Sequence, residues 1–155
     1  MDALRTELRK LLKGGQAFEP FDAAIAEFDA SEHGVVPKGA EHSPWQIVEH
    51  LQFSLRDILD FCQNADGSYM EKEWPDDYWP TNAIPRPGQW ETSVRLYREG
   101  IQECERFLDD PGRDLFAPFA WGDGQTLLHE ILLVADHAAY HVGELVELKR
   151  WIAAM

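Results

Sequence analysis

The last thirty residues, Thr126 to Met155, carry the pattern of one long helix and constrain the fold more than any other stretch. Thr126 is of a residue type that often caps the start of a helix. The apolar residues that recur at helical spacing after it are Leu128, Ile131, Leu132, Ala135, Leu145, Leu148 and Ile152. We therefore expect the rest of the chain to be organised around this helix.

Three further long helical patterns precede it, and no stretch alternates convincingly as a strand does. The predicted helices cover residues 2–13, 43–63 and 91–108, and a shorter helical piece covers residues 18–29. In the first of these, one side holds Leu4, Leu8, Leu11 and Leu12. The second begins with a clear start signal, because Ser43 can cap it, Pro44 fits its first position and Gln46 completes a capping box. The length of 155 residues suits one domain over residues 1–155, and the pattern predicts an all-α bundle.

Two long connections separate these helices. Residues 65–90 hold Pro75, Pro80, Pro85 and Pro87 together with several tryptophans and tyrosines, and residues 109–125 are rich in glycine and proline. A long aromatic connection in a small domain is often a lid or a pocket wall. The alternative interpretation, which we weigh equally, is a loop whose aromatic side chains only cover the ends of the bundle.

The charge balance excludes several classes of partner. Twenty-eight acidic residues against fourteen basic ones give a net charge of −14, which argues against binding to nucleic acid or to an anionic membrane. No apolar run is long enough to span a bilayer, and the first residues lack a signal-peptide core, so we expect a cytoplasmic protein. Cys62 and Cys104 lie on predicted apolar faces, which favours buried, inert thiols over a disulfide or redox pair.

A pair of histidines on the last helix suggests a metal site. His137 and His141 are four residues apart, so their side chains project from one face with Cβ atoms about 5–6 Å apart. His50, on the second long helix, is the best candidate for a third ligand. Three histidine ligands and an open position are typical of a catalytic zinc site, and nickel also accepts imidazole. From the spacing alone, two partly exposed histidines without a metal explain the pattern slightly better than a metal site does.

Residues around the pair leave further alternatives open. Glu144 and Glu130 each lie seven residues from His137, on nearly the same helix face, and either is a candidate to orient an imidazole, to act as a fourth ligand or to be a solvated carboxylate. Gly143 in the middle of a helix suggests either a close approach of another helix or room for the backbone near the site. His33, His42 and His129 have no partner at ligand spacing.

Three segments of the chain resemble the DinB/YfiT-like metalloenzyme family. They are Ser43-Pro44-Trp45-Gln46-Ile47-Val48-Glu49-His50-Leu51, Gly124-Gln125-Thr126-Leu127 and Asp136-His137-Ala138-Ala139-Tyr140-His141-Val142-Gly143-Glu144-Leu145. The resemblance implies a four-helix bundle with up-up-down-down topology. It also implies one divalent metal, zinc or nickel, held by His50, His137 and His141, and a homodimer. The long connection at residues 65–90 departs from the commonest members of the family.

The resemblance also narrows the function. Members of the family include thiol-dependent S-transferases that use bacillithiol, mycothiol or glutathione, and proteins regarded as metal-dependent hydrolases. We therefore favour an enzyme that acts on a small molecule, with the metal activating either a low-molecular-weight thiol or water. A non-catalytic metal- or ligand-binding bundle that serves in a stress response is the alternative. A protein that sequesters hydrophobic small molecules is a third hypothesis, suggested by Trp45, Trp74, Trp79 and Trp90.

Overall fold

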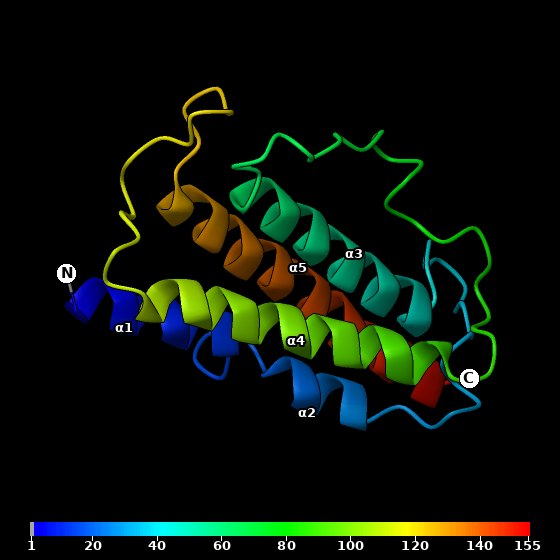
Figure 1. Ribbon diagram of the computed structural model, residues 1–155. Helices are drawn as coiled ribbons and strands as arrows, with labels where there is room; N and C mark the ends of the chain where they lie inside the picture. Colours follow the sequence, from blue (N-terminus) through cyan, green and yellow to red (C-terminus); the bar gives the residue numbers. More distant parts are fainter. Residues whose placement is uncertain (1) are drawn as a thin grey trace.

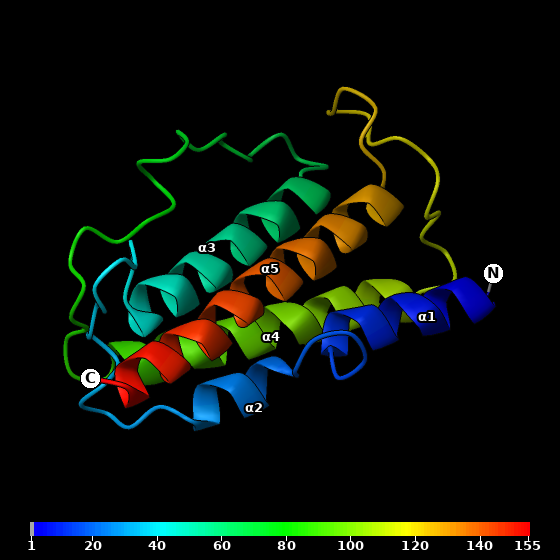
Figure 2. The ribbon, with the colours of Figure 1, turned by 180° about the vertical axis from the view of Figure 1, so that it is seen from behind.

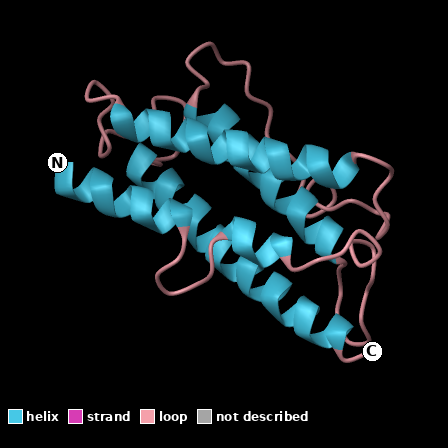
Figure 3. Cartoon of the chain, turned by 90° about the horizontal axis from the view of Figure 1, so that it is seen from below, coloured by secondary structure: helices cyan, strands magenta, loops and turns pink. Residues whose placement is uncertain are grey.

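The computed structural model describes residues 2–155, and in this part of the chain it is built from helices joined by loops. The helices are α1 (Asp2–Lys13), α2 (Phe21–Ala26), α3 (Pro44–Cys62), α4 (Gln89–Asp109) and α5 (Leu127–Ala153). The four long helices pack lengthwise against one another, and the short α2 lies beside them (Figure 1). Figure 3 shows helices and loops only, and the sole β-type pairing of residues 2–155 is an isolated bridge between Pro118 and Thr126. The predicted all-α bundle is confirmed.

The long helices differ in direction. Helices α3 and α4 run in parallel, because Ser93 near the start of α4 donates a hydrogen bond to Glu49 near the start of α3, and Arg56 reaches Glu103 further along. Helices α1 and α5 run the opposite way (Figure 1). Counted from α1, the observed order is therefore up-down-down-up, whereas the family resemblance implied up-up-down-down. The parallel pair is possible because the connection from Gln63 to Gly88 travels the whole length of the bundle before α4 begins.

The predicted start signals form as expected. The Ser43 hydroxyl accepts a hydrogen bond from the backbone N–H of Gln46 at 3.2 Å, and the Gln46 side chain accepts one from the backbone N–H of Ser43 at 3.0 Å. This is a complete capping box, and it fixes the first turn of α3. At the start of α5, the Thr126 hydroxyl accepts from the backbone N–H of His129 at 3.2 Å. Both helices that carry the candidate ligands therefore begin at side-chain caps.

Two details of the N-terminal region differ from expectation. Helix α2 covers Phe21–Ala26 and not residues 18–29, because Pro20 has an extended backbone and stands at the N-cap position. In α1, Leu8 and Leu12 are buried but Leu11 is 41% exposed. The side chain that α1 buries instead is Arg5, which reaches the end of α4.

The core is made of leucine, isoleucine and valine side chains from all the long helices. Cys62 and Cys104 are free and buried within it, and burial raises the pKa of both thiols, that of Cys104 to about 12. This confirms the prediction of buried thiols, which burial keeps protonated and unreactive. None of the helices within residues 2–155 combines the length and the apolar character that crossing a membrane requires.

Helix α2 and the turn after it cover one side of α5, as seen from behind in Figure 2. Lys149 of α5 donates to Glu32 in this turn at 2.7 Å, and the side chains of both residues are largely shielded from solvent. The opposite side of the α3–α5 pair is covered by the long connection between α3 and α4 (Figure 1). The candidate ligands on α3 and α5 therefore lie under this connection.

Candidate metal centre

The three candidate ligands meet between α3 and α5. His50 comes from the second turn of α3, and His137 and His141 come from the middle of α5. One nitrogen of each ring can be chosen so that all three lie within 4.8 Å of one another. The Nε2 atoms of His50 and His137 are 2.9 Å apart. The structure thus brings together the three histidines that the sequence suggested, although they come from regions far apart in the chain.

The long connection holds His50 in place. The Nδ1–H of His50 donates to the backbone carbonyl of Tyr78 at 3.0 Å, which leaves the Nε2 lone pair facing the other histidines. The indole of Trp79 stacks on the His50 ring with centroids 3.8 Å apart, and His42 stacks on the indole at 3.7 Å. Sequence reasoning missed this stack of three rings and had set His42 aside. The dense run of aromatic residues at 74–79 was the one available signal.

Glu144 orients the third histidine. Its carboxylate accepts a hydrogen bond from the Nδ1–H of His141 at 2.5 Å, so the Nε2 of His141 also faces the cluster. Of the three roles considered for Glu144, the structure supports that of a partner that orients an imidazole. Burial raises the pKa of this carboxyl group, and the negative charge of Glu41 raises it further.

All three imidazoles are neutral near pH 7. Burial lowers the pKa of His50 and of His137 to about 4, and that of His141 to about 3. The neighbouring rings add to the effect, since a second positive charge in the cluster is unfavourable. The neutral ring is the form that binds a metal through its free nitrogen.

The donor set fits a divalent ion of the zinc or nickel type. Imidazole nitrogen is a preferred donor for both ions. Two nitrogens bound to one tetrahedral zinc at about 2.0–2.1 Å stand roughly 3.3 Å apart, so the 2.9 Å between His50 and His137 requires only a small adjustment. Within residues 2–155, the cluster contains no carboxylate or thiol besides the three histidines. Three protein donors correspond to a catalytic and not to a structural zinc site.

The remaining residues that the sequence singled out near His137 and His141, or as further histidines, do not belong to the cluster. Glu130 does not join the cluster; it is only 5% exposed and lines a neighbouring cavity. The idea of close helix approach at Gly143 is wrong, because a Cβ added there would meet nothing within 4 Å. His129 is exposed, and His33 stacks on Trp90 away from the cluster.

A cavity of about 780 Å³ opens beside His137. Helices α3 and α5 and both long connections line it, and the residues from the first connection are Asn64, Tyr69, Glu71, Trp74 and Tyr78. The aromatic connection therefore forms a pocket wall, one of the two interpretations that its composition allowed. Because His137 belongs to both the cluster and the cavity wall, a small molecule in the cavity would reach the cluster directly.

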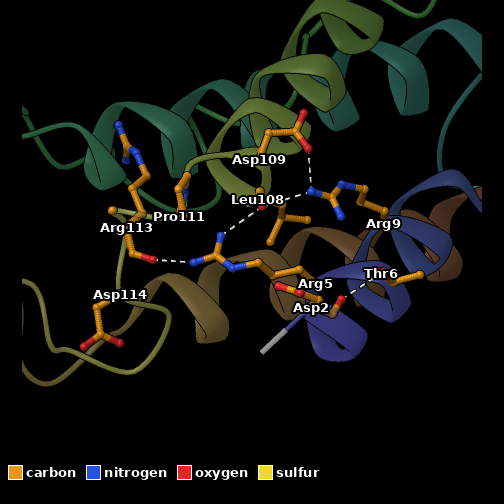
Figure 4. A pocket seen from close by; sticks show the side chains of 10 residues that line it. Asp2, Arg5, Thr6, Arg9, Leu108, Asp109, Pro111, Arg113 and Asp114 are labelled. Atoms are coloured by element: carbon orange, nitrogen blue, oxygen red, sulfur yellow. Dashed lines mark hydrogen bonds and ion pairs between the residues drawn. The ribbon is translucent and has the colours of Figure 1, made fainter.

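A second cavity, of about 630 Å³, lies where α1 meets the end of α4 (Figure 4). It contains Arg5, Arg9 and Arg113, but the side chains of Arg5 and Arg9 are already engaged. Arg5 donates to the carbonyls of Leu108 and Arg113, and Arg9 donates to Asp109 (Figure 4). We therefore assign this cluster to the stability of the fold and not to ligand binding.

Replacing Glu144 with alanine is expected to weaken zinc binding about 10–100-fold, because His141 loses the acceptor that fixes its tautomer and orientation. Competition with a chromophoric zinc chelator measures this affinity. Glu147→Ala is the matched control, since Glu147 lies three residues further along α5, is exposed and pairs with Arg150. Equal zinc affinity for the Glu144→Ala and Glu147→Ala proteins would contradict the role assigned to Glu144.

In a comparison with protein-family models, the model of the DinB superfamily matches residues 15–145, which include α2 to α4, most of α5 and all three clustered histidines. Comparisons with curated proteins and with solved structures find no match.

Proposed function

We propose that this chain, which belongs to the DinB superfamily, is a metal-dependent enzyme whose ion is held by His50, His137 and His141. The observation that carries the proposal is the convergence of three neutral imidazoles from α3 and α5 beside a cavity. A divalent ion bound by these rings, zinc or nickel by donor type, would act as a Lewis acid that activates a thiol or a water molecule.

Residues around the cluster hold two of its imidazole rings in place, which supports a preorganised metal site. Tyr78 and Trp79 hold His50, and Glu144 holds His141, so two of the three rings are fixed by partners outside the cluster. Fixed donors lose little conformational freedom when an ion binds. The remaining ring, His137, faces the cavity, and this is the side from which we propose that the substrate enters.

Two reaction classes follow from this arrangement. In a thiol-dependent S-transferase, a low-molecular-weight thiol would be the nucleophile that attacks an electrophilic substrate. In a hydrolase, water would take that place. The cavity is large enough for a small molecule in either case.

One assay separates the two classes. Zinc- or nickel-loaded protein is incubated with 1-chloro-2,4-dinitrobenzene plus glutathione, cysteine or bacillithiol, and separately with p-nitrophenyl acetate without thiol. Consumption of the electrophile that requires thiol and exceeds the rate with thiol alone indicates a transferase, and ester cleavage without thiol above the rate in buffer indicates a hydrolase. In either case we expect the activity to disappear in the His137→Ala variant.

The competing hypothesis is a bundle that binds metal or ligand without turnover. It predicts that the loaded protein leaves both substrates at the background rate. That result across related electrophiles and esters would overturn the enzyme proposal and would leave a binding role for the same three histidines.

A further inference from the structure

The cavity beside His137 is both acidic and aromatic. The carboxylates that line it are Asp57, Glu71, Asp123 and Glu130. The aromatic side chains that line it are Phe61, Tyr69, Trp74, Tyr78 and Trp121. Across the described chain, residues 2–155, neither lysine nor arginine contributes to its wall. A cavity of this composition repels anions and favours a positively charged group that carries apolar surface.

Two buried oxygens in its α3 wall have no partner in the described structure. Ser54 is only 7% exposed, and its hydroxyl makes no hydrogen bond. One turn later, the Oδ1 atom of Asp57 is also without a partner, while its Oδ2 atom accepts from the hydroxyls of Tyr78 and Tyr69. Buried polar atoms are normally hydrogen-bonded, so these two point to a polar group that enters the cavity.

Glu130 faces the same space from α5. It is 5% exposed and lines the cavity wall. Burial raises its pKa, the positive charge that the neighbouring His129 can carry opposes this in part, and the charge of Asp57 raises it further. No lysine or arginine of residues 2–155 lines the cavity, so a cation from outside the chain would relieve the repulsion between the carboxylates of Asp57 and Glu130.

We propose that this cavity binds an organic ammonium ion, with the cationic head between Asp57 and Glu130 and the apolar body against the aromatic wall. An inorganic cation would use the carboxylates but not the apolar surface of Trp74 and Trp121, which also line the cavity. An ammonium group uses both, through charge-assisted hydrogen bonds and cation–π contacts.

The position of Glu130 also indicates how such a ligand would lie. Glu130 and His137 are seven residues apart on α5, which corresponds to about 10 Å along the helix axis. Here the inference rests on the proposed function: if the cluster is catalytic, the substrate has a reactive group roughly 10 Å from its ammonium group. Amine-bearing esters, amides or electrophiles of that length form the substrate class that we infer.

Binding to the metal-free protein tests the inference without using activity. The probes are 2-phenylethylamine, 2-phenylethanol and 3-phenylpropionate, which have similar size but carry positive, zero and negative charge. Trp74 and Trp121 line the cavity, so tryptophan fluorescence reports binding, and calorimetry confirms it. We expect the amine to bind about tenfold or more tightly than the alcohol and the acid not to bind.

Substitutions that remove one charge locate the head group. Glu130→Gln and Asp57→Asn are each expected to lower the affinity for the amine about tenfold. Glu99→Gln is the matched control, because Glu99 is exposed on α4, pairs with Arg95 and does not line this cavity. Using two variants keeps the test valid if one of them fails to fold, which circular dichroism detects.

Several outcomes would overturn the inference. They are equal binding of the alcohol and the amine, preferred binding of the acid, displacement of the amine by millimolar Mg²⁺, or amine affinity unchanged in both variants. Repeating the titrations after adding zinc separates this test from that of the proposed function. Amine binding in a protein that fails to bind zinc supports the cavity assignment and contradicts only the metal site, whereas zinc binding without amine binding overturns the cavity assignment alone.

Discussion

The His137→Ala variant is expected to lose more than about 100-fold in affinity for zinc or nickel. Removing a residue that hydrogen-bonds a metal ligand typically lowers metal affinity about 10–100-fold. Removing one of the three metal-binding nitrogens should therefore lower the affinity further. His137 is the ligand that faces the cavity, so its loss also removes the link between the metal and the substrate space. Competition with a chelator, carried out once with zinc and once with nickel, measures the affinity of the protein for each ion.

His129→Ala is the control for this result. His129 lies two turns earlier on the same helix, is exposed and is not part of the cluster. Its replacement should leave the metal affinity and the helical circular dichroism unchanged. Similar affinities for the two variants would show that the metal is bound elsewhere, and the assignment of His137 as a ligand would fail.

The Arg5→Ala variant is expected to lower the free energy of unfolding by about 2–4 kcal/mol. The Arg5 guanidinium donates to the carbonyls of Phe107 and Leu108 at the end of α4, and to that of Arg113 in the loop beyond (Figure 4). Alanine leaves these acceptors without their donor, in a region where Arg5 is buried. The contact between α1 and the end of α4 should therefore weaken first.

Urea denaturation monitored by circular dichroism measures this loss. Lys10→Ala on the same helix is the control, because Lys10 is exposed and pairs with the exposed Glu7 three residues earlier, so its loss should change stability by less than about 0.5 kcal/mol. If the two variants unfold at the same urea concentration, Arg5 does not have the anchoring role that its hydrogen bonds suggest.

Local signals in the sequence predicted most of the helical framework. Ser43, Pro44 and Gln46 marked the start of α3 because a capping box is a contact between near neighbours in the chain. The spacing of apolar residues identified which face of each helix is buried, but it did not distinguish residues at the centre of that face from residues at its partly exposed edge. Leu11 was therefore expected in the core, where the long side chain of Arg5 is buried instead.

The surroundings of the site depend on contacts between distant parts of the chain, and local patterns do not reveal such contacts. The stack of His42, Trp79 and His50 joins three separate segments and forms only because the long connection crosses α3. Glu130 likewise lies in a cavity whose other walls come from α3 and from both long connections, and of these α3 and the first connection are distant from it in the chain. Spacing and resemblance suggested the three histidines, and spacing left an orienting role for Glu144 open as one of several alternatives. Metal binding, activity and the homodimer stay predictions.

The metal content of the purified protein is the most direct test of the central claim. Elemental analysis after loading should find about one zinc or nickel ion per chain, as expected for one cluster with three donors. The combined His50→Ala/His137→Ala/His141→Ala variant should lose the ion and keep its helical circular dichroism. A wild-type protein that holds no ion under any loading condition, or a triple variant that holds as much as the wild type, would contradict the claim.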